Sequence, residues 1–372
     1  MDTVSGEMRA KVLLVGPYPP PFGGISATVR DLYQILVAEQ GYEVTVLNIG
    51  ERRMQPSLEY LSPRGGIHFV RLLLQHAFDG YVIHLETNGH NFKSWLTALV
   101  CSVCGLFNRQ RSIIAFGSGM LPDYMRNCSL LVRVVVKVTS RCAGFIICRN
   151  DEMVVALQEQ GCPRDKIKVL PGFVGIKGRK TQPVPTEVKE FFKRHDPVLG
   201  AAVSLSPEYG IPLALQVVAD LRPHYPKVGL ILMGIGQAES VALEDLGPVK
   251  QQVLLAGVLP PDVALGVMAN LTLFLRPTYC DGDSISVREA LALGVPVVAS
   301  AAGMRPSSVK TFEVGSREDL CKKVQQLLTE ISSGKPIVLN QEENRGSGDT
   351  LLKLYETLFG GSALSINNVG GH

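Results

Sequence analysis

The sequence of 372 residues contains little of what marks several common classes of protein. Its net charge is only +3, from 37 basic and 34 acidic residues, which is too small a surplus to indicate a nucleic-acid-binding surface. No apolar run reaches the roughly 20 residues that a membrane-spanning helix needs, and the longest candidate, 95–107, is too short. The polar segment 1–9 does not resemble a signal peptide.

The eight cysteines form no closely spaced framework of the kind that disulfide-rich secreted domains show. Most of them lie in apolar contexts, which favours a reducing, cytoplasmic setting. Cys101 and Cys104 have the spacing of a redox or metal motif, but they lie in an apolar helical run without a second ligand pair. We therefore interpret them as core residues.

Strands and helices alternate through the first half of the chain, and this order predicts a parallel sheet covered on both faces. The predicted strands are 11–16, 43–49, 81–85, 112–117, 144–148 and 167–171. The predicted helices are 26–40, 67–78, 92–107, 129–141 and 151–160.

A second alternating run follows a linker with a short helix at 187–194, and its length suits a second Rossmann-like domain. The predicted strands are 198–205, 228–233, 253–258, 271–275 and a strand beginning at 297. The predicted helices are 211–222, 237–246, 286–293, 317–331 and 350–359. We assign a first domain to 1–175, a second domain to 176–340, a final helical segment to 341–361, and a disordered tail to 362–372.

The stretch 277–300 carries the most informative pattern: a polar loop after a buried strand, then a short helix and another strand. In an open α/β sheet, ligands bind at the carboxyl ends of strands, where this loop is expected to lie. Gly282 allows close approach of a ligand to the backbone, and Asp283 stands beside it. The amides of Ser284, Ile285 and Ser286 are expected at a helix N-terminus, which favours an anion such as a diphosphate.

Two carboxylates, Asp281 and Glu289, lie eight positions apart across this loop and helix. So placed, they could accept hydrogen bonds from two diols of one ligand, such as a sugar and a ribose. Arg276 and Arg288 add positive charge nearby. The alternative is that Asp281 caps a turn and Glu289 is a solvated helix residue.

This stretch resembles the donor-binding signature of the GT-B glycosyltransferases of family 4, the glycosyl transferases group 1. The matching positions are Pro277, Gly282, Glu289, Ala290, Gly294, Pro296, Val297, Val298 and Ala299. Thr278 replaces the family's serine, and Asp281 replaces its first glutamate. The resemblance implies a GT-B fold of two Rossmann-like domains, with Asp281 contacting the donor sugar and Glu289 the ribose. It also implies that 1–175 is the N-terminal acceptor-side domain and 176–340 the nucleotide-sugar-binding domain, and that the final helical segment, 341–361, could pack back on the first domain.

Gly23 and Gly24 precede the first predicted helix after a proline-rich turn that is not a dinucleotide fingerprint. They could hold an anion or let a substrate approach, or they could be a simple connector. The resemblance implies that this pair faces the donor phosphate and the acceptor.

His84 is predicted to lie near the end of a strand, in a segment that continues to His90 at the carboxyl edge of the sheet. There an imidazole could bond a substrate hydroxyl or phosphate, or it could be an ordinary strand-end histidine. Relatives usually carry a donor-contacting histidine after the next strand, where this chain has Ser118.

A second departure concerns the cations that grip the donor diphosphate in relatives, because Ser204 and Tyr209 stand in place of the family's arginine and lysine. Arg276 and Arg305 are the replacements that we predict, with Arg276 first, and Arg288 is also near in sequence. An ion pair of Arg276 with Asp281 or Asp283 is the competing hypothesis.

The segment 93–149 carries eight basic residues and a single acidic one, Asp123, among apolar helices. This pattern is compatible with a peripheral membrane face, or with core helices that carry solvated arginines.

The resemblance thus implies a retaining hexosyltransferase that uses a nucleotide diphospho-sugar as co-substrate, with no metal or other cofactor, and a glycan or lipid-linked acceptor in polysaccharide biosynthesis. Asp281 and Asp283 have the spacing of a metal motif, but their place in the donor signature argues against that role. Catalysis would depend on Asp281, Arg276 and His84 through positioning and charge stabilisation. The setting would be cytoplasmic, and contact with the inner face of a membrane is one interpretation of the basic segment 93–149. The alternatives are a degenerate GT-B protein that binds without turnover, and a sugar-nucleotide epimerase.

Overall fold

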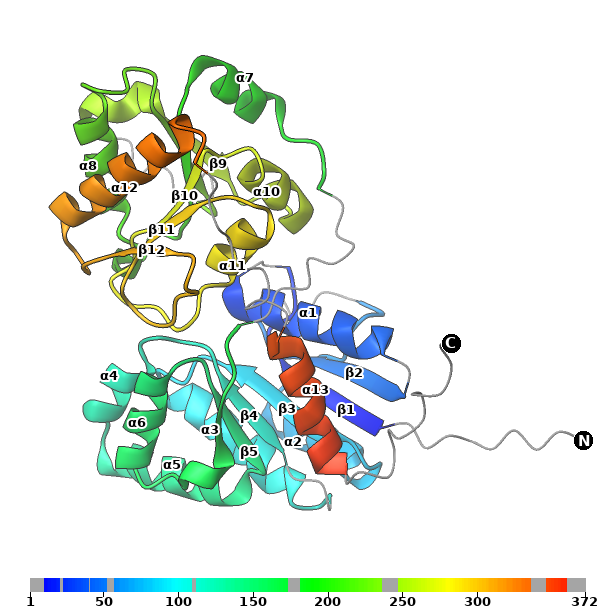
Figure 1. Ribbon diagram of the computed structural model, residues 1–372. Helices are drawn as coiled ribbons and strands as arrows, with labels where there is room; N and C mark the ends of the chain where they lie inside the picture. The colour runs from blue at the N-terminus through cyan, green and yellow to red at the C-terminus, as the bar shows by residue number, and fades with distance from the viewer. Residues whose placement is uncertain are drawn as a thin grey trace, which may run out of the picture. The chain divides into compact units, whose positions relative to one another are not determined.

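The computed structural model describes residues 10–20, 23–39, 41–51, 57–108, 112–172, 181–235, 247–335 and 346–359. The chain divides into two compact units (Figure 1). The first unit combines Met1–Gly175 with Arg345–His372, and the second unit is Ile176–Asn344.

The first unit contains a six-stranded parallel sheet with the strand order β2-β1-β3-β4-β5-β6. Its strands are β1 (Ala10–Gly16), β2 (Tyr42–Asn48), β3 (Val82–Thr87), β4 (Ile113–Phe116), β5 (Phe145–Cys148) and β6 (Ile167–Val169). The order reverses direction between β1 and β3. The loops after these two strands therefore border the point where open α/β sheets bind ligands.

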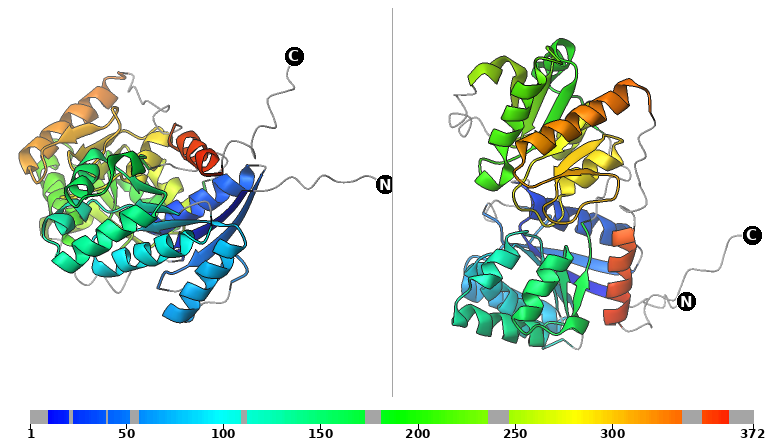
Figure 2. Two further views of the ribbon diagram at one scale, coloured as in Figure 1. Left: turned by 90° about the horizontal axis from the view of Figure 1, so that it is seen from below. Right: turned by 60° about the vertical axis from the view of Figure 1, so that its left-hand side comes forward.

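Helices cover both faces of this sheet (Figures 1 and 2). One face packs against α2 (Gly66–Phe78), α3 (Phe92–Gly105), α4 (Leu121–Arg126), α5 (Leu130–Cys142) and α6 (Asp151–Glu159). The other face packs against α1 (Gly24–Ala38) and α13 (Gly346–Phe359), and a short 3-10 turn, η1 (Arg164–Lys166), precedes β6. The final helix thus shares a core with strands at the opposite end of the sequence, through Leu351, Leu354 and Tyr355.

A buried polar network ties α13 to the centre of the first sheet. The Tyr355 hydroxyl bonds Nδ1 of His84 on β3, and His84 Nε2 lies 3.4 Å from Glu86 Oε1. Glu86 is also paired with Arg149 at 2.9 Å, and Arg149 donates to the carbonyl of Leu170. Burial alone would raise the pKa of Glu86, but the charge of Arg149 and the neighbouring His84 outweigh it and lower that pKa.

The second unit contains another six-stranded parallel sheet, with the order β12-β11-β10-β7-β8-β9. Its strands are β7 (Val198–Ala202), β8 (Gly229–Met233), β9 (Val253–Gly257), β10 (Leu273–Arg276), β11 (Val297–Ser300) and β12 (Lys310–Phe312). Read from β9, this is the order 3-2-1-4-5-6 of the dinucleotide-binding fold, with its switch point between β7 and β10.

Two sets of helices cover the second sheet. One face packs against α8 (Ile211–Leu221), α12 (Arg317–Ser332) and the 3-10 segment η4 (Gly247–Gln252). The other face packs against α7 (Thr186–Arg194), α10 (Pro261–Met268) and α11 (Ile285–Ala292), and η2 (Pro207–Tyr209) precedes α8.

The observed elements confirm most predicted ones to within a few residues, while α4, α10 and β12 were not predicted. The predicted helix at 237–246 and the predicted tail at 362–372 lie outside the described residues. Within the described parts of the chain, no helix has both the length and the apolar character needed to cross a bilayer.

Candidate functional site

The loop between β10 and α11 lies at the switch point of the second unit. β10 ends at Arg276, and α11 begins at Ile285 with Ser284 as its N-cap. The Ser284 hydroxyl accepts from the Val287 amide at 3.4 Å and lies 3.1 Å from the Ser286 hydroxyl. The first-turn amides of α11 therefore point out of the helix at this sheet edge, as predicted from the sequence.

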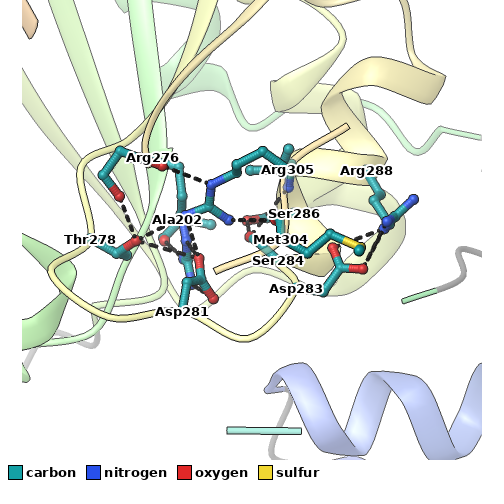
Figure 3. A network of polar contacts seen from close by, with 12 residues as sticks. Ala202, Arg276, Thr278, Asp281, Asp283, Ser284, Ser286, Arg288, Met304 and Arg305 are labelled. Atoms are coloured by element: carbon teal, nitrogen blue, oxygen red, sulfur yellow. Dashed lines mark hydrogen bonds and ion pairs between the residues drawn. The ribbon is translucent and has the colours of Figure 1, made fainter. Parts of the chain in front are cut away.

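Asp281 lies between two arginines from neighbouring strand ends (Figure 3). Its carboxylate accepts from Arg276 Nε at 2.9 Å and from Arg305 at 3.1 Å, and the Thr278 hydroxyl lies 3.4 Å away. Arg276 also donates to the Ala202 carbonyl at the end of β7, and Arg305 to the Ser300 carbonyl at the end of β11. One carboxylate thus joins three adjacent strands at their carboxyl ends.

This cluster is largely removed from water, since the side chains of Arg276, Asp281 and Arg305 are 12%, 10% and 5% exposed. Burial alone would raise the pKa of Asp281, but the two guanidinium groups outweigh it and lower that pKa. Asp281 is therefore ionised at neutral pH.

A second ion pair lies beside the first. Asp283 accepts from Arg288 at 2.7 Å, and their side chains are 1% and 3% exposed. The three arginines and two aspartates of these two ion-paired groups carry a net charge of +1 by themselves, before the carboxylate of Glu289 on α11 is counted. An excess cation at the carboxyl edge of a parallel sheet attracts an anionic ligand.

The hypothesis of an ion pair between Arg276 and Asp281 is therefore confirmed. The direct contacts of Asp281 with a donor sugar and of Glu289 with a ribose remain predictions. Glu289 lies on α11, partly exposed, one turn beyond the N-terminus of the helix. Gly282 is buried, and its carbonyl accepts from the Met304 amide of the loop after β11.

Two glycines hold the neighbouring loops against this one. Gly210 has φ +65°, and a Cβ there would lie 1.9 Å from the Pro277 carbonyl oxygen. Gly303 has φ +71°, and its Cβ would lie 2.2 Å from the Asp281 carbonyl oxygen. Glycine is therefore required at both positions by conformation and by contact.

Tyr209 is a contributor that the sequence reasoning missed. Its ring lies under the guanidinium of Arg276, with 4.9 Å from the ring centroid to Cζ. The residue that replaces the family's lysine thus supports an arginine that reaches over from β10. The signal in the sequence that could have indicated this contact was an arginine on an otherwise apolar strand, together with an aromatic residue in the loop after β7.

In the first unit, Gly23 caps α1 and Gly24 begins it. Their dihedral angles do not demand glycine, since neither φ is positive, and a Cβ on Gly24 would meet nothing within 4 Å. The Gly23 amide donates to Ser26 Oγ at 2.8 Å. The fold of the described residues therefore leaves open space at Gly24.

The prediction that His84 lies near a strand end is wrong. β3 continues to Thr87, and the His84 ring is held in the core by Tyr355, with 1% of the residue exposed. The strand extends because Glu86, which reads as a loop residue, is neutralised by Arg149. The imidazole at this edge is that of His90, whose Nδ1 lies 2.7 Å from Ser118 Oγ.

The cysteine interpretation is confirmed, because Cys101 and Cys104 are buried in the core of the first unit. In the described ranges, the His, Cys, Asp and Glu side chains form no group of three that could hold a metal ion.

Two parallel α/β units of this kind define the GT-B class, and comparison with known proteins agrees. Residues 196–330 match the family model Glycosyl transferases group 1. The search of curated proteins finds no match.

The solved structures that resemble the chain cover nearly its whole length. They include sucrose-phosphate synthase from Thermosynechococcus elongatus (18% identity, 95% of this chain and 100% of that chain, TM-score 0.73). HepE from Anabaena in complex with UDP is similar to the same extent (18% identity, 94% and 99% covered, TM-score 0.70). A protein named as a UDP-N-acetylglucosamine 2-epimerase from Listeria monocytogenes also matches (15% identity, 95% and 98% covered, TM-score 0.60). The GT-B fold and the resemblance to group 1 glycosyltransferases are thus confirmed, and these findings support a glycosyltransferase.

We expect Gly210→Ala to destabilise the second unit more than Gly334→Ala does. Both residues have the left-handed backbone conformation, with φ +65° and +68°, but a Cβ on Gly334 would meet nothing within 4 Å. The conformational cost of about 1–2 kcal/mol is common to both, and the overlap with Pro277 adds about 1–3 kcal/mol. Urea unfolding followed by circular dichroism measures the difference, and equal effects would contradict the packing described. The fluorescence of Trp95, in the first unit, is the internal control.

We expect Asp281→Asn to lower the free energy of unfolding at pH 7 by about 3–5 kcal/mol, because it leaves two buried arginines without their carboxylate. Asp220→Asn is the matched control. Asp220 pairs with Arg317 in a bridge whose side chains are 29% and 51% exposed, so this change should cost about 1 kcal/mol or less.

The same pair of variants tests the pH dependence. The folded pKa of Asp281 is lowered, so its contribution is present above the unfolded value of about 3.9 and is lost as the pH falls through the folded pKa. The stability advantage of wild type over Asp281→Asn should shrink below about pH 4. An advantage that stays constant down to pH 2 would show that Asp281 is not held by the arginines.

Proposed function

We propose that this protein transfers a hexose from a nucleotide diphospho-sugar to a hydroxyl of a glycan or lipid-linked glycan, with retention of configuration and without a metal ion. The observation that carries the proposal is the cationic cluster at the switch point of the second unit, where Arg276 and Arg305 share the single carboxylate of Asp281. Such an edge is suited to a ligand with an anionic centre and polar ends.

In this proposal, Arg276 and Arg305 stabilise the charge that develops on the departing diphosphate, together with the first-turn amides of α11. Asp281 holds both guanidinium groups in place before the donor arrives. Glu289 accepts hydrogen bonds from the ribose diol. No protein nucleophile is required, because rate enhancement comes from positioning and charge stabilisation.

UDP is the nucleotide that the structural neighbours favour, since HepE was solved with UDP, with UDP-glucose, and with UDP and glucose. These ligands belong to HepE, and we extend them to this chain as part of the proposal. The epimerase-named neighbour keeps a second candidate open. An epimerase would interconvert free nucleotide-sugars in the absence of an acceptor, whereas a transferase would not.

The outer face of the first unit supports an acceptor that resides in a membrane. The helices α2, α3 and α5 pack in a row, α3 against both α2 and α5. We name their exposed hydrophobic residues, with the two that follow α3, the apolar layer: Ile67, Phe78, Phe92, Leu96, Val103, Leu106, Phe107, Leu130, Leu131, Val134 and Val138. A patch of this extent usually marks an interaction surface.

The charge on these helices indicates the chemistry of the partner that would bind them. None of the three contains an aspartate or glutamate, while they expose five cations: Arg71, Lys93, Arg133, Lys137 and Arg141. Apolar side chains interleaved with cations fit the headgroup region of an anionic bilayer. We therefore propose that the protein works as a peripheral membrane protein, with the apolar layer against anionic lipid.

Calorimetric titration with UDP-, GDP- and ADP-sugars tests the donor site. We expect saturable binding of one nucleotide class, about 10- to 100-fold weaker in Glu289→Ala because hydrogen bonds to a charged acceptor are lost. Glu187→Ala, an exposed glutamate on α7, is the control that should leave the affinity unchanged. Absence of binding by every donor to folded protein would refute the proposed function.

Flotation with vesicles tests the membrane face. Wild type should bind vesicles containing 30 mol% phosphatidylglycerol and not pure phosphatidylcholine. Replacing Arg133, Lys137 and Arg141 by Gln should weaken binding on the order of 100-fold, at about 1 kcal/mol per cation. The matched control replaces Lys189, Lys193 and Arg194 on α7 of the second unit, which are equally exposed. Equal losses in both triple variants would exclude a specific face.

A further inference from the structure

A histidine is fixed at the carboxyl edge of the first sheet. His90 follows β3 by three residues, at the switch point between β1 and β3. The preceding Gly89 has φ +82°, and a Cβ there would lie 2.6 Å from the Phe116 ring. The buried Trp95 donates its indole N–H to the Gly89 carbonyl at 2.8 Å. The turn that carries His90 is thus held by the core and does not depend on a ligand for its shape.

His90 forms a polar pair with Ser118 of the loop after β4. His90 Nδ1 lies 2.7 Å from Ser118 Oγ, and the same oxygen accepts from the Met120 amide at 3.2 Å. Because Ser118 Oγ already accepts an amide proton, its hydroxyl can donate to Nδ1. This contact fixes the orientation of the imidazole ring relative to the loop after β4.

The pair lies near the start of α1. Ser118 follows Gly117, whose amide donates to the Thr87 carbonyl, and a Cβ on Gly117 would lie 3.5 Å from Ile25 in the first turn of α1. The open space at Gly24 belongs to the same turn. An imidazole and a hydroxyl, both partly exposed, can donate and accept hydrogen bonds and are therefore suited to the hydroxyl groups of a sugar.

We infer that the His90–Ser118 pair binds a hydroxyl group of the acceptor sugar in the first unit. The inference rests on the proposed function, in that the acceptor is taken to be a sugar. It assigns to His90 the contact with substrate that the sequence suggested for His84. Ser118 orients the ring through its contact with Nδ1.

Nuclear magnetic resonance of the histidine rings tests this contact on the full chain. The protein contains seven histidines, so ring-labelled protein gives few resonances, and His90→Gln identifies the one from His90. The probes are the methyl glycosides of glucose, galactose and mannose, with glycerol as the control polyol. We expect at least one glycoside to shift the His90 resonance saturably, while the resonance of His224, exposed in the second unit, stays in place.

Ser118→Ala serves as the second variant, because it keeps the ring and removes its hydrogen-bond partner. It should weaken the glycoside response about threefold to tenfold. The inference is overturned if no glycoside moves the His90 resonance, if glycerol moves it equally, or if Ser118→Ala leaves the response unchanged.

The outcomes also separate this inference from the proposed function. Donor binding with an unresponsive His90 would keep the transferase and remove the acceptor contact. A glycoside response at His90 in a protein that binds no nucleotide-sugar would keep the sugar site and remove the transferase.

Discussion

The ion-paired cluster of Arg276, Asp281 and Arg305 is the interaction on which the second unit's functional edge depends. Two guanidinium groups and one carboxylate are withdrawn from water together, and each would be costly to bury alone. Their remaining hydrogen bonds go to the carbonyls of Ala202 and Ser300, at the ends of β7 and β11. The charge cluster therefore fixes the relative positions of three strand ends, and the loops that leave them.

The packing around this cluster explains the residue types found at Gly210, Gly303 and Tyr209. Gly210 and Gly303 bring the loops after β7 and β11 within contact of the backbone of the loop after β10. Tyr209 places an aromatic face beneath Arg276. The chain lacks the arginine and lysine that its relatives carry in the loop after β7, at Ser204 and Tyr209. Positive charge is delivered here by Arg276, at the end of β10, and Arg305, in the loop after β11, and the proposed anion-binding role depends on this different set of side chains.

Most of the fold could be predicted because apolar strands and amphipathic helices have patterns that can be recognised within their own segment of sequence. β5 is a continuous apolar run, β1 is apolar except for Lys11, and α12 starts after a capping serine. β12, with its sequence Lys-Thr-Phe, and the short helix α10 lack a clear local pattern. The pairing of Arg276 with Asp281 could be foreseen because an arginine on a buried strand requires an anion. The stacking of Tyr209 could not, since it arises between residues 67 positions apart. The error at His84 has the same origin, because Arg149, 63 positions away from Glu86, turns an apparent loop into strand.

The place of α13 in the first unit has a consequence for synthesis. Leu351, Leu354 and Tyr355 cover a sheet face that includes Val12 and Val82, so that face stays incomplete until α13 has been made. The whole of Ile176–Asn344 is made in the interval, which at ribosomal rates takes on the order of 10 to 30 s. The second unit can thus acquire its structure while the first still exposes apolar surface. The first unit is therefore begun before the second and completed after it, and for that time a nascent-chain chaperone has a defined surface to protect.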